Sequence, residues 1–242
     1  MIGIIIRLLQ LIKAMFSFNL ILTRTACLGN DALKLIGNKK YYFLNIQKGR
    51  IDYLNKIIVG SCPNIKFGDI DLIIRKDIKS IYLQEAFGYL PFIFPPKYFI
   101  FDTYSELTDQ EFKPFNNTFS SIYFNYSDLH ATFKNSYSAV GLLECVNFYN
   151  QYSLFVTNLR SRFTEIPVIF ILFPTKFDNR EKFKIRYDSI KKALLKVATF
   201  YSDIHIIEIP DQLIENTGDL FPYHFTEKSK LYVAKEILKL IK

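Results

Sequence analysis

The stretch Gly60-Ser61-Cys62-Pro63 carries a hydroxyl and a thiol directly after the apolar run Lys56–Gly60. A strand that turns tightly into a helix exposes the side chain at the turn and places backbone N–H groups of the helix N-terminus beside it, where they can stabilise an oxyanion. Gly60 permits such a turn, and Pro63 suits the first helical position because the N–H that proline lacks has no partner there. A thiol at a helix start is favoured as the thiolate, so Cys62 is a candidate nucleophile.

His224 is the candidate base for this nucleophile. It lies in a loop, in the stretch GDLFPYHFTEKSK, before the last amphipathic segment of the chain. A thiol or hydroxyl nucleophile needs a base within hydrogen-bond reach, so we expect His224 to face Cys62 or, in its place, Ser61. The acids that could orient the imidazole are Asp219, Asp102 and Glu106. The alternative is a surface histidine together with a cysteine that is a small buried side chain.

Short apolar runs alternate with helical patterns from residue 51 onward. The runs that predict buried parallel strands are Lys56–Gly60, Tyr98–Asp102, Pro167–Phe173 and His205–Ile209. Helical spacing of apolar residues marks residues 139–163, 180–201 and 225–242, with Thr226 as N-cap of the last helix. This order predicts an α/β fold, a parallel sheet with helices on both faces, whose ligands collect at the carboxyl ends of the strands.

The N-terminal fifth has a different character. Residues 1–50 hold eight Lys or Arg and one acid, and so account for +7 of the net charge of +8. The polar side chains of residues 1–24 fall on one helical stripe of an apolar segment; they are Arg7, Gln10, Lys13, Ser17 and Arg24. The longest uncharged run there is ten residues, too short to span a bilayer. Two interpretations remain, a helix packed on the domain and an in-plane helix that gives residues 1–24 peripheral membrane contact.

The chain therefore divides into a basic amphipathic segment, residues 1–50, and an α/β domain, residues 51–242, with an irregular insertion at about 107–138. Its three cysteines are odd in number and widely spaced, which fits neither a zinc motif nor a disulfide framework. They indicate thiols in a reducing, cytoplasmic compartment. No metal is expected, and no nucleic-acid partner, because the basic residues come without a nucleic-acid-binding motif.

From about residue 55 to 242, these features resemble the SGNH/GDSL hydrolase superfamily in order and spacing. The shared features are IIVGSC at the end of the first predicted strand and His224 before the closing helix. In that superfamily the third residue of a strand-terminal G-D-S is the nucleophile, and a histidine before the last helix is the base. The resemblance implies a three-layer sandwich with a flavodoxin-like sheet. It also implies candidate oxyanion or substrate-binding residues, namely Gly60, Gly88, Ser105 and Glu106.

A cysteine at the third position is closer to the capsular-polysaccharide acyltransferase-like branch, which carries G-N-C-Q and pairs Cys with His. That branch implies acyl transfer or ester hydrolysis on a carbohydrate ester in bacterial surface-polysaccharide biosynthesis. It further implies a carbohydrate or glycolipid acceptor, acyl-CoA as a donor substrate, no resident cofactor, and a site of action in the cytoplasm or on the inner face of the membrane.

The sequence departs from the superfamily pattern at two places. Phe221 stands where the family has its aspartate, and FDTYSEL replaces the segment that carries its oxyanion asparagine. Two alternatives to an acyl-transfer enzyme therefore stay open. One is a non-catalytic binding or scaffold subunit of a glycan-assembly complex, and the other is a glycosyltransferase of the same pathway.

Overall fold

The protein contains a five-stranded parallel sheet in the order β2-β1-β3-β7-β8. The computed structural model describes residues 2–37, 40–46, 49–61, 90–116, 119–218 and 221–241. The strands of this sheet are β1 (Leu20–Arg24), β2 (Tyr42–Asn45), β3 (Tyr98–Asp102), β7 (Val168–Ile171) and β8 (Ile204–Ile207). Their order is the flavodoxin-like order 2-1-3-4-5, which confirms the predicted fold class.

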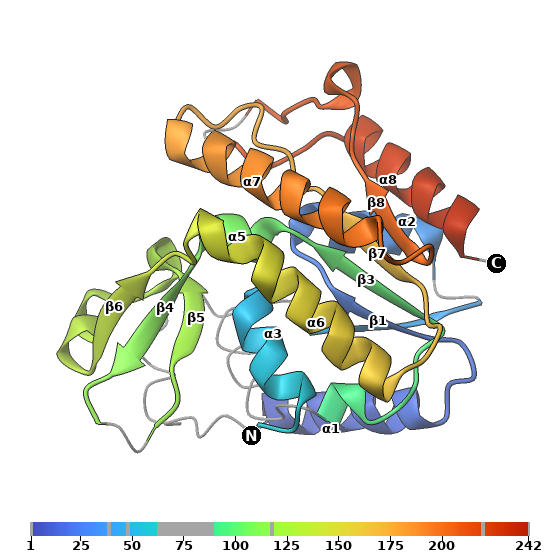
Figure 1. The fold of residues 1–242 in the computed structure, drawn as a ribbon, viewed down its shortest axis with the longest axis horizontal. Helices are drawn as coiled ribbons and strands as arrows, with labels where there is room; N and C mark the ends of the chain where they lie inside the picture. The colour runs from blue at the N-terminus through green and yellow to red at the C-terminus, as the bar shows by residue number, and fades with distance from the viewer. Residues whose placement is uncertain are drawn as a thin grey trace.

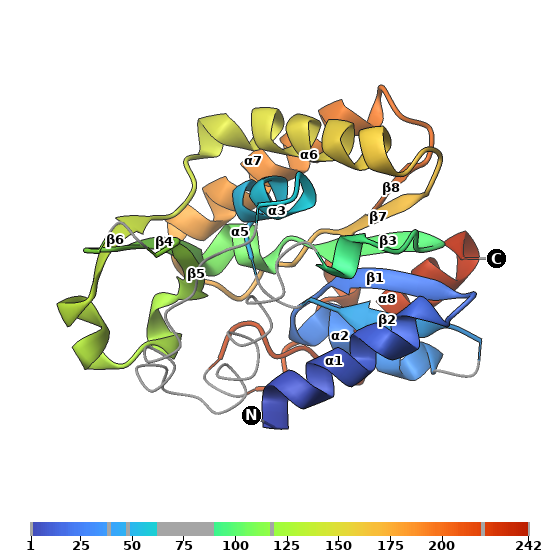
Figure 2. The ribbon, with the colours of Figure 1, turned by 90° about the horizontal axis from the view of Figure 1, so that it is seen from below.

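Helices cover both faces of the sheet (Figure 2). On one face lie α1 (Ile2–Met15), α2 (Cys27–Ile36) and α8 (Glu227–Leu240). On the other lie α3 (Ile51–Ile58), α6 (Phe148–Arg162) and α7 (Glu181–Ala198). The central strands β1, β3 and β7 are apolar along almost their whole length because both of their faces are buried. Within the described ranges, no helix combines the length and the apolar character needed to cross a membrane.

A second, smaller sheet follows the short helix α5 (Tyr104–Thr108). Its antiparallel strands are β4 (Asp109–Pro114), β5 (Ile122–Asn125) and β6 (Tyr137–Gly141), in the order β5-β4-β6. Figure 1 shows it beside the main sheet, past the carboxyl end of β3. The expectation of an irregular insertion at 107–138 is therefore wrong. A register shift between Glu111 and Phe112 breaks the alternation in β4 that would have marked a strand. Single-turn 3₁₀ segments complete the described elements, at Leu90–Phe92, Tyr126–Asp128, Ala131–Asn135, Cys145–Asn147 and Asp211–Leu213.

The predicted strand Lys56–Gly60 is also wrong, because Ile51–Ile58 forms helix α3. Ile51, Leu54 and Ile58 recur at helical spacing and are buried, which places one face of α3 against α6. The first strand of the sheet lies earlier, in the segment expected to be an amphipathic helix: α1 ends at Met15 and β1 begins at Leu20. The expected division between residues 50 and 51 therefore does not divide the sheet, since β1 and β3 are neighbours across it.

The later elements match the predictions more closely. Strand β3 has the predicted bounds. Strands β7 and β8 each begin within one residue of the predicted start. Helix α8 begins after Thr226, its predicted N-cap, although the hydroxyl of Thr226 donates to Glu215 and accepts no hydrogen bond from an N–H group of the helix. Helix α6 starts at Phe148, later than predicted, because part of the run beginning at residue 139 belongs to β6.

A buried ion pair joins the carboxyl ends of β1 and β3. Arg24 is completely buried and donates to both carboxylate oxygens of Glu106, at 2.8 and 3.1 Å. It also donates to the carbonyl of Asp102 at 2.6 Å and to that of Gly49, before α3, at 2.9 Å. Burial alone would lower the pKa of Arg24, but the charge of Glu106 outweighs it and the pKa is raised. One cation thus fixes β1, β3, α5 and the start of α3 together.

We expect Glu106→Gln to lower the free energy of unfolding by about 3–5 kcal/mol, because it removes the carboxylate that bonds directly to the buried guanidinium of Arg24. Urea denaturation followed by circular dichroism measures this loss. The double variant Arg24→Met/Glu106→Leu should recover part of it, since both members of the buried ion pair are then replaced by apolar side chains. Glu236→Gln, which removes the ion-pair partner of the exposed Lys239, is the control and should leave the midpoint nearly unchanged. Equal midpoints for Glu106→Gln and the wild type would contradict the assignment.

Candidate functional site

Cys27 lies at the strand-to-helix turn after the first strand of the sheet, which is the position that the sequence predicted for Cys62. It is the first residue of α2, two residues beyond Thr25 at the carboxyl end of strand β1, and it is an exposed, reduced thiol. The first intrahelical bond of α2 runs from Asn30 N–H to the Ala26 carbonyl at 2.8 Å, so the thiol lies at the amino end of the helix. Sequence reasoning missed Cys27 because the strand before it was assigned to the apolar N-terminal segment.

Side chains from both neighbouring strands hold this turn. The amide of Asn45, at the end of β2, accepts from Thr25 N–H at 3.1 Å and donates to the Thr25 carbonyl at 3.0 Å. The carboxylate of Asp102, at the end of β3, accepts from Ala26 N–H at 2.6 Å. Gly29 lets the first turn of α2 lie close to Thr25 and Asp102, since a Cβ at this position would be 2.7 Å from Thr25 Cβ and 3.2 Å from Asp102 Oδ2. The backbone that presents Cys27 is therefore clamped from two sides.

His224 ends a turn, in which its N–H donates to the Phe221 carbonyl at 3.3 Å, and it lies between two buried aromatic anchors. Tyr223 and Phe225 are 2% and 1% exposed, whereas His224 between them is exposed. Phe225 packs edge-on against Phe173, and the Tyr223 hydroxyl donates to Asp178. The segment is tied to the preceding loop by Thr217 N–H, which donates to the His224 carbonyl at 3.0 Å.

Cys27 and His224 line the same cavity, of about 160 Å³. Helices α2 and α8 pack together there, and Asp31 of α2 forms an ion pair with Lys230 of α8 at 2.9 Å. Burial alone would raise the pKa of Asp31, but the hydrogen bonds from Lys34 and Lys230 outweigh it and lower the pKa. Asp31 and Lys230 line the cavity as well. The structure therefore brings together a thiol at a helix N-terminus and the predicted histidine.

The other predicted nucleophile positions lie elsewhere. Gly60 and Ser61 follow the C-terminus of α3, on the face of the sheet opposite α2 and α8 (Figure 2). Ser61 lines a separate cavity with Tyr53 and Tyr123. Without a strand before it, this stretch does not form the predicted strand-to-helix turn. The remaining predicted site residues, Cys62, Gly88 and Asp219, lie outside the described residues.

The candidate site residues predicted at and after the end of β3 are buried. Ser105 and Glu106 are buried in α5, and the Glu106 carboxylate is engaged by Arg24. The carboxylate of Asp102 accepts from two backbone N–H groups, those of Ala26 and Tyr104. These bonds occupy both acids in holding the β1–α2 turn and its surroundings. Among the residues that the structure describes, no group of three or more His, Cys, Asp or Glu side chains could hold a metal ion.

Two buried carboxyl groups share the single positive charge of Arg24. Burial raises the pKa of Asp102 to about 7, against the opposing effects of Arg24 and of the N–H groups of Ala26 and Tyr104. Burial likewise raises the pKa of Glu106, although Arg24 bonds to it directly. Because one cation can balance only one carboxylate, the cluster keeps a proton on Asp102 until near-neutral pH.

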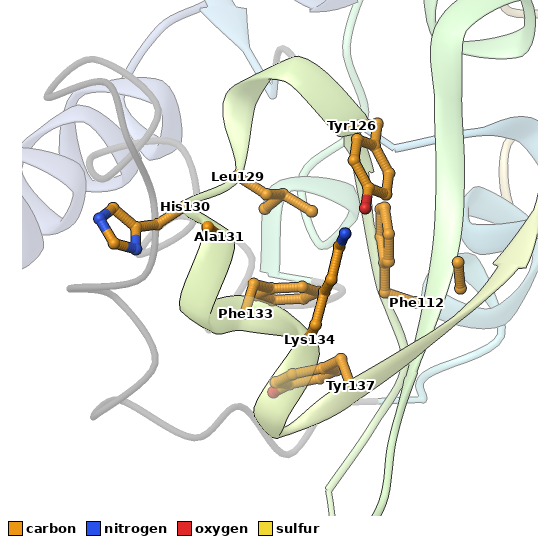
Figure 3. Close-up of a pocket in the computed structure, with 9 residues that line it drawn as sticks. Phe112, Tyr126, Leu129, His130, Ala131, Phe133, Lys134 and Tyr137 are labelled. Carbon is orange, nitrogen blue, oxygen red and sulfur yellow. The ribbon is translucent and has the colours of Figure 1, made fainter.

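A larger cavity, of about 500 Å³, lies in the small sheet and shares no residue with the Cys27–His224 cavity. Figure 3 shows Phe112, Tyr126 and Phe133 around the side chain of Lys134, with His130 pointing away. The Lys134 ammonium lies 5.8 Å from the centre of the Tyr126 ring. His130 and the hydroxyl-bearing Tyr126 and Tyr137 line it together with apolar side chains, so this cavity offers space for a ligand.

Comparison with known proteins gives distant likenesses in fold. No family model and no curated protein matches the chain. Among solved structures, a protein assigned as a GDSL-like lipase from Bacteroides ovatus shares 11% identity at a TM-score of 0.47, over 93% of this chain and 54% of its own. A salicylyl-acyltransferase from a tetracycline biosynthetic pathway shares 9% at 0.43, over 93% and 54%. An acetyl xylan esterase from the rumen bacterium Butyrivibrio proteoclasticus shares 12% at 0.42, over 94% and 65%.

The chain thus spans between half and two thirds of the length of these proteins. Similarity at this level does not identify an activity, which has to be argued from the site itself.

Gly29→Ala should destabilise the protein by about 1–3 kcal/mol, because the new methyl group must displace Thr25 or the first turn of α2. It should also slow alkylation of Cys27, which mass spectrometry after a timed iodoacetamide pulse measures. Gly37→Ala, at the other end of α2, is the matched control: its Cβ meets nothing within 4 Å, although its φ of 79° adds backbone strain. It should leave the alkylation rate of Cys27 unchanged. Equal rates in both variants would argue against the clamp.

The stability of the wild type should fall as pH rises from about 4 to 7, by up to about 4 kcal/mol from Asp102 alone. The unfolded carboxyl ionises near its ordinary pKa of 3.8, whereas the folded one keeps its proton until about pH 7. Its contribution is therefore fully present below pH 4 and is lost on passing pH 7. The side chain of the Asp102→Asn variant cannot ionise. The unfolding free energy of the wild type minus that of this variant should therefore fall as pH rises from about 4 to 7. A pH-independent difference from urea titrations would refute it.

Proposed function

We propose that this protein is an SGNH/GDSL-like acyltransferase or esterase that uses Cys27 as nucleophile and His224 as general base. The observation that carries the proposal is their place on one cavity, with Cys27 at the amino end of α2 after strand β1 and His224 before α8. This is the arrangement expected of the superfamily, but the nucleophile position is taken by Cys27, 35 residues before Cys62.

Each step of the reaction uses a group at this site. His224 takes the thiol proton as the Cys27 sulfur attacks the carbonyl carbon of an ester or thioester. N–H groups of the first turn of α2, which have no partner within the helix, are the donors suited to the oxyanion. The leaving alcohol or thiol departs with the proton from His224 and leaves an acyl thioester on Cys27. His224 then deprotonates an acceptor hydroxyl or water, whose attack releases the acyl group and restores the thiol.

The substrates follow from the resemblance together with the site. We propose a carbohydrate or glycolipid hydroxyl as acceptor and an acyl-CoA as donor, in bacterial surface-polysaccharide biosynthesis. The small volume of the cavity, about 160 Å³, suits a short acyl group such as acetyl better than a long chain. Lys230 also lines the cavity and is paired with Asp31, which Lys34 contacts as well, so these three side chains together carry a net positive charge that a phosphorylated donor would meet.

Cys27→Ala and His224→Gln should each lower the hydrolysis of p-nitrophenyl acetate and acetyl-CoA by at least about 100-fold, the usual contribution of a nucleophile or base. Cys145→Ala is the matched control, since Cys145 is a half-buried thiol near α6 and should be dispensable. Cys62→Ala tests the position first predicted. Circular dichroism of every variant separates lost chemistry from lost folding.

The outcome distinguishes the alternatives. Full activity in Cys27→Ala would refute the proposal, and loss confined to Cys62→Ala would return the nucleophile to the first predicted position. A folded wild type without acyl turnover, whose Cys27 alkylates no faster than Cys145, would indicate a non-catalytic binding or scaffold protein instead.

A further inference from the structure

Helix α1 has a second apolar face, which points away from the protein. Its inner face packs through Leu11 and Ala14, 6% and 2% exposed, and the Gln10 carbonyl accepts from Tyr42 in β2 at 3.0 Å. The outer face and the turn after it carry large apolar side chains that are 44 to 78% exposed: Ile5, Leu8, Leu9, Ile12 and Phe16. Steps of three, one, three and four residues place them on one continuous stripe.

Phe18 extends this surface beyond the helix and brings it to a basic border. Its side chain is 95% exposed. The neighbouring Asn19 donates to the Lys40 carbonyl at 2.9 Å, which places Lys40 beside the stripe. Lys13, within the helix, is also exposed. We call the apolar stripe with Phe18, Lys13 and Lys40 the α1 surface.

We propose that the α1 surface binds an anionic lipid bilayer, with α1 lying in the plane of the interface. An exposed apolar stripe bordered by lysines is the pattern of interfacial helices, whose apolar side chains enter the acyl boundary while the ammonium groups stay among anionic headgroups. The exposed ammonium groups of Lys13 and Lys40 are complementary to such lipids, whereas Arg24 and Arg50 of the same basic segment are buried and take no part. A symmetric pair of protein copies through the same surface would instead bring its lysines together without a counter-charge.

This contact also sets the orientation of the protein. Figure 2 shows α1 on the outside of the layer that contains α2 and α8. In the bound protein, the helical layer that contains α2 and α8 would therefore face the bilayer. Cys27 begins α2, and His224 comes shortly before α8. The membrane contact is independent of catalysis, and its test needs no enzymatic activity.

The experiment is co-sedimentation of the full chain with vesicles of phosphatidylcholine alone and with about 30% phosphatidylglycerol. We expect the wild type to bind the anionic vesicles more tightly and to lose affinity as salt is raised. Leu8→Gln/Ile12→Gln/Phe16→Ser should lower the partition coefficient at least about tenfold. Lys13→Glu/Lys40→Glu should remove the preference for anionic vesicles while leaving the fold intact by circular dichroism.

The matched control is Leu195→Gln/Leu238→Gln/Phe200→Ser, which removes apolar side chains that are 49%, 49% and 68% exposed, on α7, on α8 and in the turn after α7. It should bind as the wild type does, and so should Lys113→Glu/Lys134→Glu on the small sheet. Absence of wild-type binding to anionic vesicles would overturn the proposal. A wild-type dimer by light scattering that the α1 variants convert to monomer, with no vesicle binding, would also overturn it and assign the surface to a second copy.

Discussion

The guanidinium of Arg24 is the group around which the carboxyl edge of the sheet is built. A charge removed from water is costly unless it is hydrogen-bonded, and the two Nη groups of Arg24 find acceptors on three separate segments, while its Nε–H has no acceptor in the described part of the chain. At the end of β1, Arg24 therefore bonds to a carbonyl of β3 and to a carboxylate of α5. The carbonyl of Gly49, just before α3, is its third acceptor group. The arrangement is specific because losing any one partner leaves the same buried charge unmatched.

This constraint explains how the acids near the site are used. Asp102 and Glu106 follow a parallel strand at the edge where ligands usually bind, and yet both face inward to the backbone and to Arg24. What reaches solvent at that edge is the turn they support, with Cys27 at its exposed end. The site proposed for catalysis thus consists of a thiol, a histidine and a helix N-terminus, while the two acids hold the surrounding backbone.

Part of this organisation is visible in the sequence and part is not. Strands such as Tyr98–Asp102 and the helix after Thr226 are predicted correctly because each is long, apolar or periodic, and bounded by clear turns. His224 is found for the same reason, as a polar residue in a loop before an unmistakable helix. The run Ile57-Ile58-Val59 fits a strand and a helix equally well, and its packing against α6 decides for helix.

Strand β1 is hidden because it follows the apolar α1 with no glycine or proline between them, so its cysteine is not recognised either. The bond from Arg24 to Glu106 joins residues 82 positions apart, which no local pattern reports.

The Cys27–His224 cavity joins parts of the chain that the ribosome produces far apart in time. About 200 residues separate the two side chains, which at ordinary elongation rates corresponds to about 10–40 s. Throughout that interval the thiol exists without its histidine, and the site is complete only when α8 docks against α2 and Lys230 meets Asp31. A nascent chain would therefore present the thiol without the histidine that the proposed reaction requires, so that only the completed fold holds the whole site.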